Sequence, residues 1–129
     1  MTKYQKADKL FRQVLLDEAT KDEGGRIFCP LSNSWLYPDQ LHVCHFIPRD
    51  YIYLRYDKRN CILCAAYSNV TETGISVEGC NDSLHIVKYK KFIGEENVKI
   101  LENIRRSGDK LLPSQLNKMI EEWQSKGYK

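Results

Sequence analysis

One stretch of the chain decides how the rest is interpreted: HVCHFIPRDYIYLRYDKRNCILCAAYSN, residues 42–69. The strand-like run Leu41 to Ile47 ends at Pro48, and a loop rich in tyrosine and charge follows over Arg49 to Arg59. Asn60 predicts the start of a short helix over Cys61 to Ser68, because its side chain can cap an unpaired N–H group. The stretch therefore predicts a strand, a loop and a helix in succession.

A histidine at the end of a strand, followed by two asparagines, is the layout of a ββα-metal nuclease site. Such a site needs a base that deprotonates water, a cation that stabilises charge on the scissile phosphate, and a group that fixes the histidine ring. His45 is the predicted base, because the pKa range of histidine suits neutral pH. Asn69 is the predicted oxygen ligand of Mg²⁺ or Mn²⁺. Asn60 is predicted to hydrogen-bond main chain across the loop in addition to capping the helix.

Basic and aromatic residues beside this site favour contact with DNA, and the alternative interpretation is an ordinary solvated surface. The predicted phosphate contacts are Arg49, Arg55, Lys58 and Arg59. Tyr89 lies among three lysines, a pattern that combines phosphate contacts with base stacking. The tyrosines of the loop are interpreted either as stacking on unpaired bases or as half-buried residues, and they are Tyr51, Tyr53 and Tyr56.

Outside this stretch the pattern is mainly helical. Apolar spacing predicts amphipathic helices from Lys3 to about Ala19, from about Glu95 to Arg106, and after Pro113. A short strand over Arg26 to Cys29 is expected to pair with Leu41 to Ile47 as a hairpin, with a turn over residues 33–40 between them. The stripe of the last helix is interpreted as core packing or as the interface of a homodimer, and it comprises Leu116, Met119, Ile120 and Trp123.

Composition sets the broad class. With 129 residues, 42% of them hydrophobic, the chain is the size of one domain and can bury a core. Lys and Arg number 20 and Asp and Glu 17, so the formal charge is 20 − 17 = +3, which fits a local basic face. No apolar run is long enough for a membrane span, and the first residues do not resemble a secretion signal. We therefore expect a soluble cytoplasmic protein with no membrane partner.

The five cysteines favour reduced thiols over a disulfide framework, because their number is odd and no secretion signal precedes them. Cys61 and Cys64 have the CxxC spacing that holds zinc or carries redox chemistry. An equally good interpretation is that both are small buried hydrophobic residues on a helix.

The chain resembles the NinG (Rap) family of lambdoid phage recombination endonucleases over nearly its whole length. The elements that carry the resemblance are Cys44-His45-Phe46-Ile47-Pro48-Arg49, the segment from Leu54-Arg55 to Asn60, and the segment from Cys64 to Asn69. The resemblance implies an HNH-like, metal-dependent endonuclease that cuts branched DNA such as Holliday junctions or flaps, beside recombination proteins and in the host cytoplasm if the gene is phage-borne. The implied fold is α+β, with a small ββα-metal (HNH, treble-clef-like) core over about residues 26–70. An N-terminal helix and a C-terminal helical extension over about residues 93–126 flank this core. The resemblance implies that all of these elements belong to one domain, residues 1–129.

Two departures from that family concern metals. Its two zinc knuckles correspond here to Cys29-Pro-Leu-Ser32 and Ala65-Ala-Tyr-Ser68, which retain one thiol. Either the zinc is lost and packing replaces it, or Cys61 and Cys64 join Cys29, and Cys44 as a fourth ligand, in a rearranged Zn²⁺ site. Cys44 also occupies the position where many HNH sequences have an aspartate metal ligand, and a thiolate prefers Zn²⁺ to Mg²⁺.

These departures leave three hypotheses of different classes. The first is the active endonuclease, and the second is a nuclease-derived module that binds DNA or a protein partner without cutting. The third is a zinc-stabilised protein-interaction domain.

Overall fold

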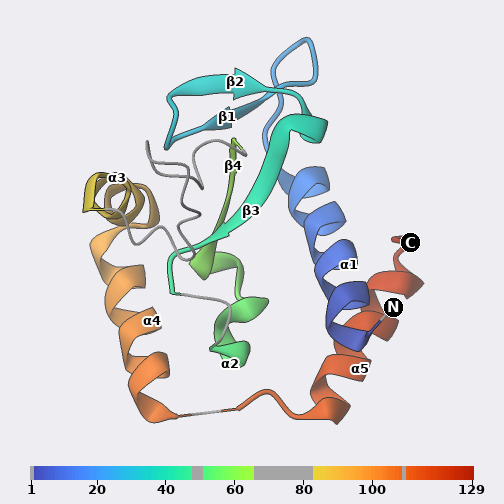
Figure 1. Cartoon of the computed structure of the whole chain (residues 1–129). Coiled ribbons are helices and arrows are strands. Elements are labelled where there is room, and N and C mark those ends of the chain that lie inside the picture. Colours follow the sequence, from blue (N-terminus) through green and yellow to red (C-terminus); the bar gives the residue numbers. More distant parts are fainter. Residues whose placement is uncertain (1, 48–50, 66–82, 109) are drawn as a thin grey trace.

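The computed structural model describes residues 2–47, 51–65, 83–108 and 110–129 (Figure 1). Over these residues the fold is α+β, as expected, with α-helices around two antiparallel two-stranded sheets. The predicted residues Arg49 and Asn69 lie outside the described part of the chain. The elements in chain order are α1 (Lys3–Glu18), β1 (Ile27–Cys29), β2 (Ser34–Leu36), the 3-10 turn η1 (Pro38–Gln40), β3 (Leu41–His45), α2 (Ile52–Arg55), the 3-10 turn η2 (Lys58–Asn60), β4 (Cys61–Ala65), α3 (Ser83–Ile93), α4 (Glu95–Ser107) and α5 (Pro113–Ser125).

The hairpin of β3 and β4 lies at the centre of the molecule (Figure 1). Its antiparallel register places His45 opposite Cys61 and Leu41 opposite Ala65. The expected helix from Cys61 is therefore wrong for residues 61–65, which form a strand. All five residues of β4 are buried, and a short run that is apolar on both faces has no periodicity that separates a strand from a helix.

The first sheet also differs from the sequence-based expectation. β1 pairs with β2, Phe28 opposite Trp35, and not with β3. Asn33 makes the short connection possible because it adopts a left-handed φ of 54°, a conformation that asparagine tolerates better than most residues. β1 still reaches the central hairpin, since the main-chain N–H of Ala65 on β4 donates to Cys29 Sγ at 3.3 Å.

The three predicted helices are confirmed as α1, α4 and α5. Thr2 and Gln5 form a capping box at the start of α1, and Gly108 ends α4 in the left-handed conformation, with a φ of 71°. The helix α3 was not predicted. Figure 1 shows α1 and α5 side by side on one side of the hairpin and α3 and α4 on the other.

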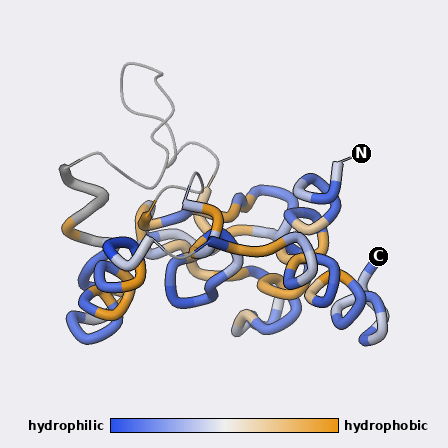
Figure 2. The backbone as a smooth tube through the Cα atoms, turned by 90° about the horizontal axis from the view of Figure 1, so that it is seen from below, coloured by the Kyte–Doolittle hydropathy of each residue, from blue (hydrophilic) through white to orange (hydrophobic). Residues whose placement is uncertain are grey.

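Two apolar clusters fill the spaces between these elements. The hairpin cluster joins residues of the strands to α3 and α4, and Cys64, Tyr89 and Leu101 belong to it. The α1/α5 cluster includes Phe11, Cys61 and residues of α5. Figure 2 shows hydrophobic and hydrophilic stretches alternating along the helices, as expected when each helix buries one face.

The stripe of α5 is core packing. Leu116 and Ile120 are buried against α1, and Trp123 packs on Phe11 with ring centroids 5.9 Å apart. The stripe therefore belongs to the core of the chain, and the homodimer stays a prediction. Among the described residues no helix has the length and apolar character needed to cross a membrane.

Candidate functional site

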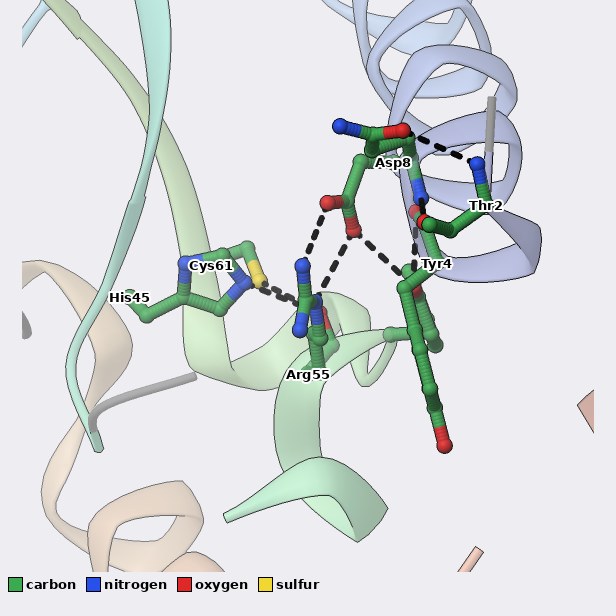
Figure 3. A network of polar contacts seen from close by, with 8 residues as sticks. Thr2, Tyr4, Asp8, His45, Arg55 and Cys61 are labelled. Carbon is green, nitrogen blue, oxygen red and sulfur yellow. Dashed lines mark hydrogen bonds and ion pairs between the residues drawn. The ribbon is translucent and has the colours of Figure 1, made fainter. Parts of the chain in front are cut away.

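His45 is the last residue of β3, and its ring is held by the loop that connects the two strands. Its Nε2 lies 2.9 Å from the main-chain carbonyl of Arg55 (Figure 3), and the residue is only 9% exposed. A carbonyl oxygen can only accept, so Nε2 carries the hydrogen and donates it. In the neutral ring Nδ1 then carries the lone pair, which is the tautomer that a base acting through Nδ1 requires.

The position of that carbonyl depends on an ion pair between α2 and α1. The Arg55 guanidinium donates through both Nε and Nη2 to the two carboxylate oxygens of Asp8, with an Nε to Oδ1 distance of 2.9 Å (Figure 3). Arg55 therefore holds His45 through its main chain and α1 through its side chain. We predicted that Arg55 grips phosphate, but in this structure a carboxylate occupies both positions of its hydrogen-bonding fork.

Two tyrosines complete this network. The guanidinium of Arg55 lies 5.4 Å from the ring centroid of Tyr4, and the hydroxyl of Tyr56 donates to Asp8 Oδ1 at 2.9 Å. Tyr56 is buried and packs edge-on against Phe11. Burial, and then its hydrogen bond to Asp8, raise the pKa of Tyr56 well above the ordinary value for tyrosine. Tyr56 is therefore a neutral core residue and is not available for stacking on a base.

Asn60 fastens the loop, as predicted, although it precedes a strand and not a helix. Its Oδ1 accepts from the main-chain N–H of Ile47 at 2.7 Å, and its Nδ2 donates to the carbonyls of Ile47 at 2.9 Å and Leu54 at 3.2 Å. The side chain is completely buried. Asn60 thus joins the two ends of the loop that carries the Arg55 carbonyl, and it acts on His45 by positioning.

Tyr89 of α3 also hydrogen-bonds main chain beside His45. Its hydroxyl lies 2.9 Å from the carbonyl of Asn60 and also donates to the carbonyl of Cys44. The residue is fully buried, and burial raises its pKa well above the ordinary value. The prediction that Tyr89 stacks on bases is therefore wrong. Its ring packs on Phe46, the residue that follows His45, with ring centroids 5.4 Å apart.

The other described basic residues of the loop are also paired. Lys58 lies 2.6 Å from Glu18 of α1, and Arg59 forms a two-point pair with Asp57, with 2.7 Å between Nη2 and Oδ2. Both cations remain about half exposed, and exposed pairs of this kind contribute less than about 1 kcal/mol. A phosphate could therefore replace either carboxylate at low cost, and the predicted DNA contacts of Lys58 and Arg59 stay predictions.

The two thiols of the CxxC motif do not share a site. Cys64 is buried in the hairpin cluster beside Cys29, whereas Cys61 is buried in the α1/α5 cluster, where its Sγ lies 3.8 Å from the Arg55 carbonyl. Residues three apart on a strand point to opposite faces, and for this reason the spacing that suits a zinc knuckle separates the thiols here. Burial raises the pKa of both thiols well above the ordinary value, so both are protonated at neutral pH.

Cys44 differs from the other described cysteines. It is disulfide-bonded, whereas Cys29, Cys61 and Cys64 are buried thiols. The expectation of reduced thiols is therefore wrong for Cys44. A sulfur in a disulfide is not a thiolate, so Cys44 is not a metal ligand in this structure.

The described residues contain no cluster of candidate metal ligands. No group of three or more His, Cys, Asp or Glu side chains within residues 2–47, 51–65, 83–108 and 110–129 is arranged to hold one. Of the two predicted ligands of the catalytic metal, Cys44 is bonded to another sulfur and Asn69 lies outside the described residues. We therefore derive no chemical step through a metal ion.

Comparisons of the chain with protein-family models, with curated proteins and with solved structures gave no match.

Sequence reasoning proposed His45 and Asn60 as site residues but missed the residues that contact them and their loop. Asp8 looked like one more exposed charge on an amphipathic helix, and no local pattern linked it to Arg55, 47 positions away. A single tyrosine among lysines likewise gave no sign that Tyr89 is buried. A signal for Tyr89 was present in the sequence, because Ile86, Tyr89 and Ile93 lie at i, i+3 and i+7 of α3.

Proposed function

We propose that the chain is an endonuclease that hydrolyses DNA at branched recombination intermediates, with His45 as its general base. The observation that carries the proposal is the hydrogen bond from His45 Nε2 to the Arg55 carbonyl. This bond fixes the ring and selects the tautomer in which Nδ1 can take a proton from water. A fixed orientation matters because a base must lie within hydrogen-bonding distance of the proton that it removes.

The order of the elements gives further support. His45 ends β3, the loop is fastened by the buried Asn60, and β4 follows directly. This order of histidine, loop asparagine and second strand agrees with the hairpin part of a ββα-metal layout. The choice of branched DNA, and of a divalent metal as cofactor, rests on the resemblance to the NinG family.

The test is a cleavage assay on matched linear duplex, flap and four-way junction DNA, each with Mg²⁺, Mn²⁺ or EDTA. We expect cleavage of the branched substrates that is lost with EDTA, and a loss of at least about a hundredfold in His45→Ala. The variant His45→Gln separates catalysis from folding, because the glutamine amide can still donate to the Arg55 carbonyl but cannot act as a base. His42→Ala is the matched control, since His42 is exposed on the same strand.

Each outcome decides something definite. Cleavage retained in folded His45→Ala and His45→Gln would reject His45 as the base. Junction binding without products in any of the metals would reject the nuclease and favour the non-catalytic DNA-binding module. Equal losses in His42→Ala and His45→Ala would show that the assay reports on folding of β3.

A further inference from the structure

The short helix α2 is flanked by two adjacent hollows. The larger, of about 740 Å³, lies between the loop that follows α2 and the helix α5, and the smaller, of about 360 Å³, lies between α2 and the end of α4. Tyr53 and Leu111 line both hollows, so the two are adjacent. We call this surface the α2 groove. In Figure 1 the segment that leads into α5, residues 110–112, lies below α2 in the view.

The α2 groove is more basic than the chain as a whole. Its described lining holds five cations and two carboxylates, an excess of 5 − 2 = +3 in a chain whose whole net charge is +3. Lys110 and Lys118 are exposed and have no ion-pair partner among the described residues. The other cations are Lys58, Arg59 and Arg105, and the carboxylates are Asp57 and Glu122.

Aromatic faces lie beside these charges. Tyr51 and Tyr53 are 41% and 40% exposed, whereas Tyr56 next to them is buried. The guanidinium of Arg105 lies over the ring of Tyr51, 4.9 Å from its centroid, in a cation–π contact at the edge of the smaller hollow. Cations beside exposed aromatic rings favour a ligand that is a polyanion and also carries flat groups that can stack.

We propose that the α2 groove binds an unpaired DNA strand, with its bases stacked on Tyr51 and Tyr53 and its phosphates at Lys110 and Lys118. The choice of DNA over another polyanion rests on the proposed function. The groove and the histidine are joined by one segment, because Leu54 and Tyr56 line the groove while the carbonyl of Arg55 between them holds His45. A single strand in the groove would thus lie on the segment that positions the base, which connects recognition of a branch to the site of cleavage.

The experiment measures binding apart from cleavage. A fluorescent oligothymidine of about 15 nucleotides is titrated with the full chain in EDTA, and anisotropy is followed over a range of salt concentrations. We expect Tyr51→Ala and Tyr53→Ala to weaken binding about tenfold each, since stacking on one aromatic residue is worth about 1–3 kcal/mol. Removing Lys110 and Lys118 together should reduce the slope of log K against log salt by about 1.4, or about 0.7 for each phosphate that a lysine no longer neutralises.

Controls outside the groove make the result specific. Tyr37→Ala removes an exposed tyrosine beside β2, and Lys6→Ala removes an exposed lysine of α1, so neither should change binding. His45→Ala should bind like the unaltered chain. Because the binding assay needs no cleavage, the two proposals can fail separately. A chain that binds DNA through the α2 groove but does not cut it would reject the proposed function and keep this inference. A chain that cuts branched DNA without using the groove would reject this inference and keep the proposed function.

Three results would overturn the inference. The first is no binding of oligothymidine by the unaltered chain. The second is equal affinity of the groove variants and the two controls, which would locate the DNA on another surface. The third is equally tight binding of polyglutamate, which would show that the groove accepts an acidic protein and does not read bases.

Discussion

The ion pair of Asp8 with Arg55 gives a prediction that separates a structural role from that of an ordinary surface charge. Replacing Asp8 by alanine removes the acceptor of three donors, Arg55 Nε, Arg55 Nη2 and the Tyr56 hydroxyl. The side chain of Arg55 is 16% exposed and that of Asp8 is 36% exposed, so water can replace only part of the hydrogen bonding that Asp8 provides. Exposed pairs contribute about 0–1 kcal/mol, and breaking a fully buried pair costs about 3–5 kcal/mol.

An intermediate loss of about 2 kcal/mol is therefore expected for Asp8→Ala. For a domain of this size that corresponds to a fall in Tm of about 6–10 °C. The assay is urea and thermal unfolding followed by circular dichroism. Asp8→Asn keeps one acceptor oxygen and should lose about half as much stability. Glu121→Ala is the control, because Glu121 is an exposed acidic residue of α5.

The same variant tests the link to His45. If the Asp8 carboxylate positions the Arg55 carbonyl, Asp8→Ala should also lower kcat of cleavage in chains that are fully folded at the assay temperature. An unfolding free energy within about 0.5 kcal/mol of the Glu121→Ala control would refute the argument, since it would mean that water satisfies Arg55 and Tyr56 without Asp8.

Three further predictions follow from burial. Asn60→Ala should destabilise the fold by about 3 kcal/mol in urea unfolding, because it leaves the N–H of Ile47 and two carbonyls without their partner, and an unchanged midpoint would contradict the role given to Asn60. Leu116→Ala should cost about 2–5 kcal/mol, whereas Leu112→Ala, at a residue 56% exposed, should change stability by less than about 0.5 kcal/mol; equal effects would place the α5 stripe outside the core. Burial raises the pKa of the Cys64 thiol above its ordinary 9.0, so the folded state holds this proton more tightly than the unfolded state. The stabilisation from the thiol proton is therefore complete below pH 9 and falls by about 1.4 kcal/mol per pH unit above it. When the free energy of unfolding is measured at about pH 8, 9 and 10, it should decline less steeply in Cys64→Ala than in the unaltered chain.

Within the candidate site, the sequence indicated that Asn60 hydrogen-bonds main chain across the loop, but it did not reveal that Arg55 pairs with Asp8. The spacing of histidine and asparagine is a local pattern that survives in the loop geometry. Whether an arginine side chain is open to phosphate or closed on a carboxylate depends on which residue packs against it. That residue, Asp8, comes from a helix far away in the sequence.

Local sequence was sufficient to predict the helices α1, α4 and α5, because apolar spacing, capping residues and terminal glycines act within a few positions of one another. Long-range pairing was needed to make Cys61–Ala65 a strand, since an apolar run becomes β4 when β3 offers unpaired N–H and C=O groups and both of its faces are covered. The same pairing places Cys61 in the α1/α5 cluster and Cys64 in the hairpin cluster. Local propensity depends on neighbours in the sequence. Strand pairing and the choice of ion-pair partner depend on neighbours in space, and no local stretch of sequence identifies those neighbours.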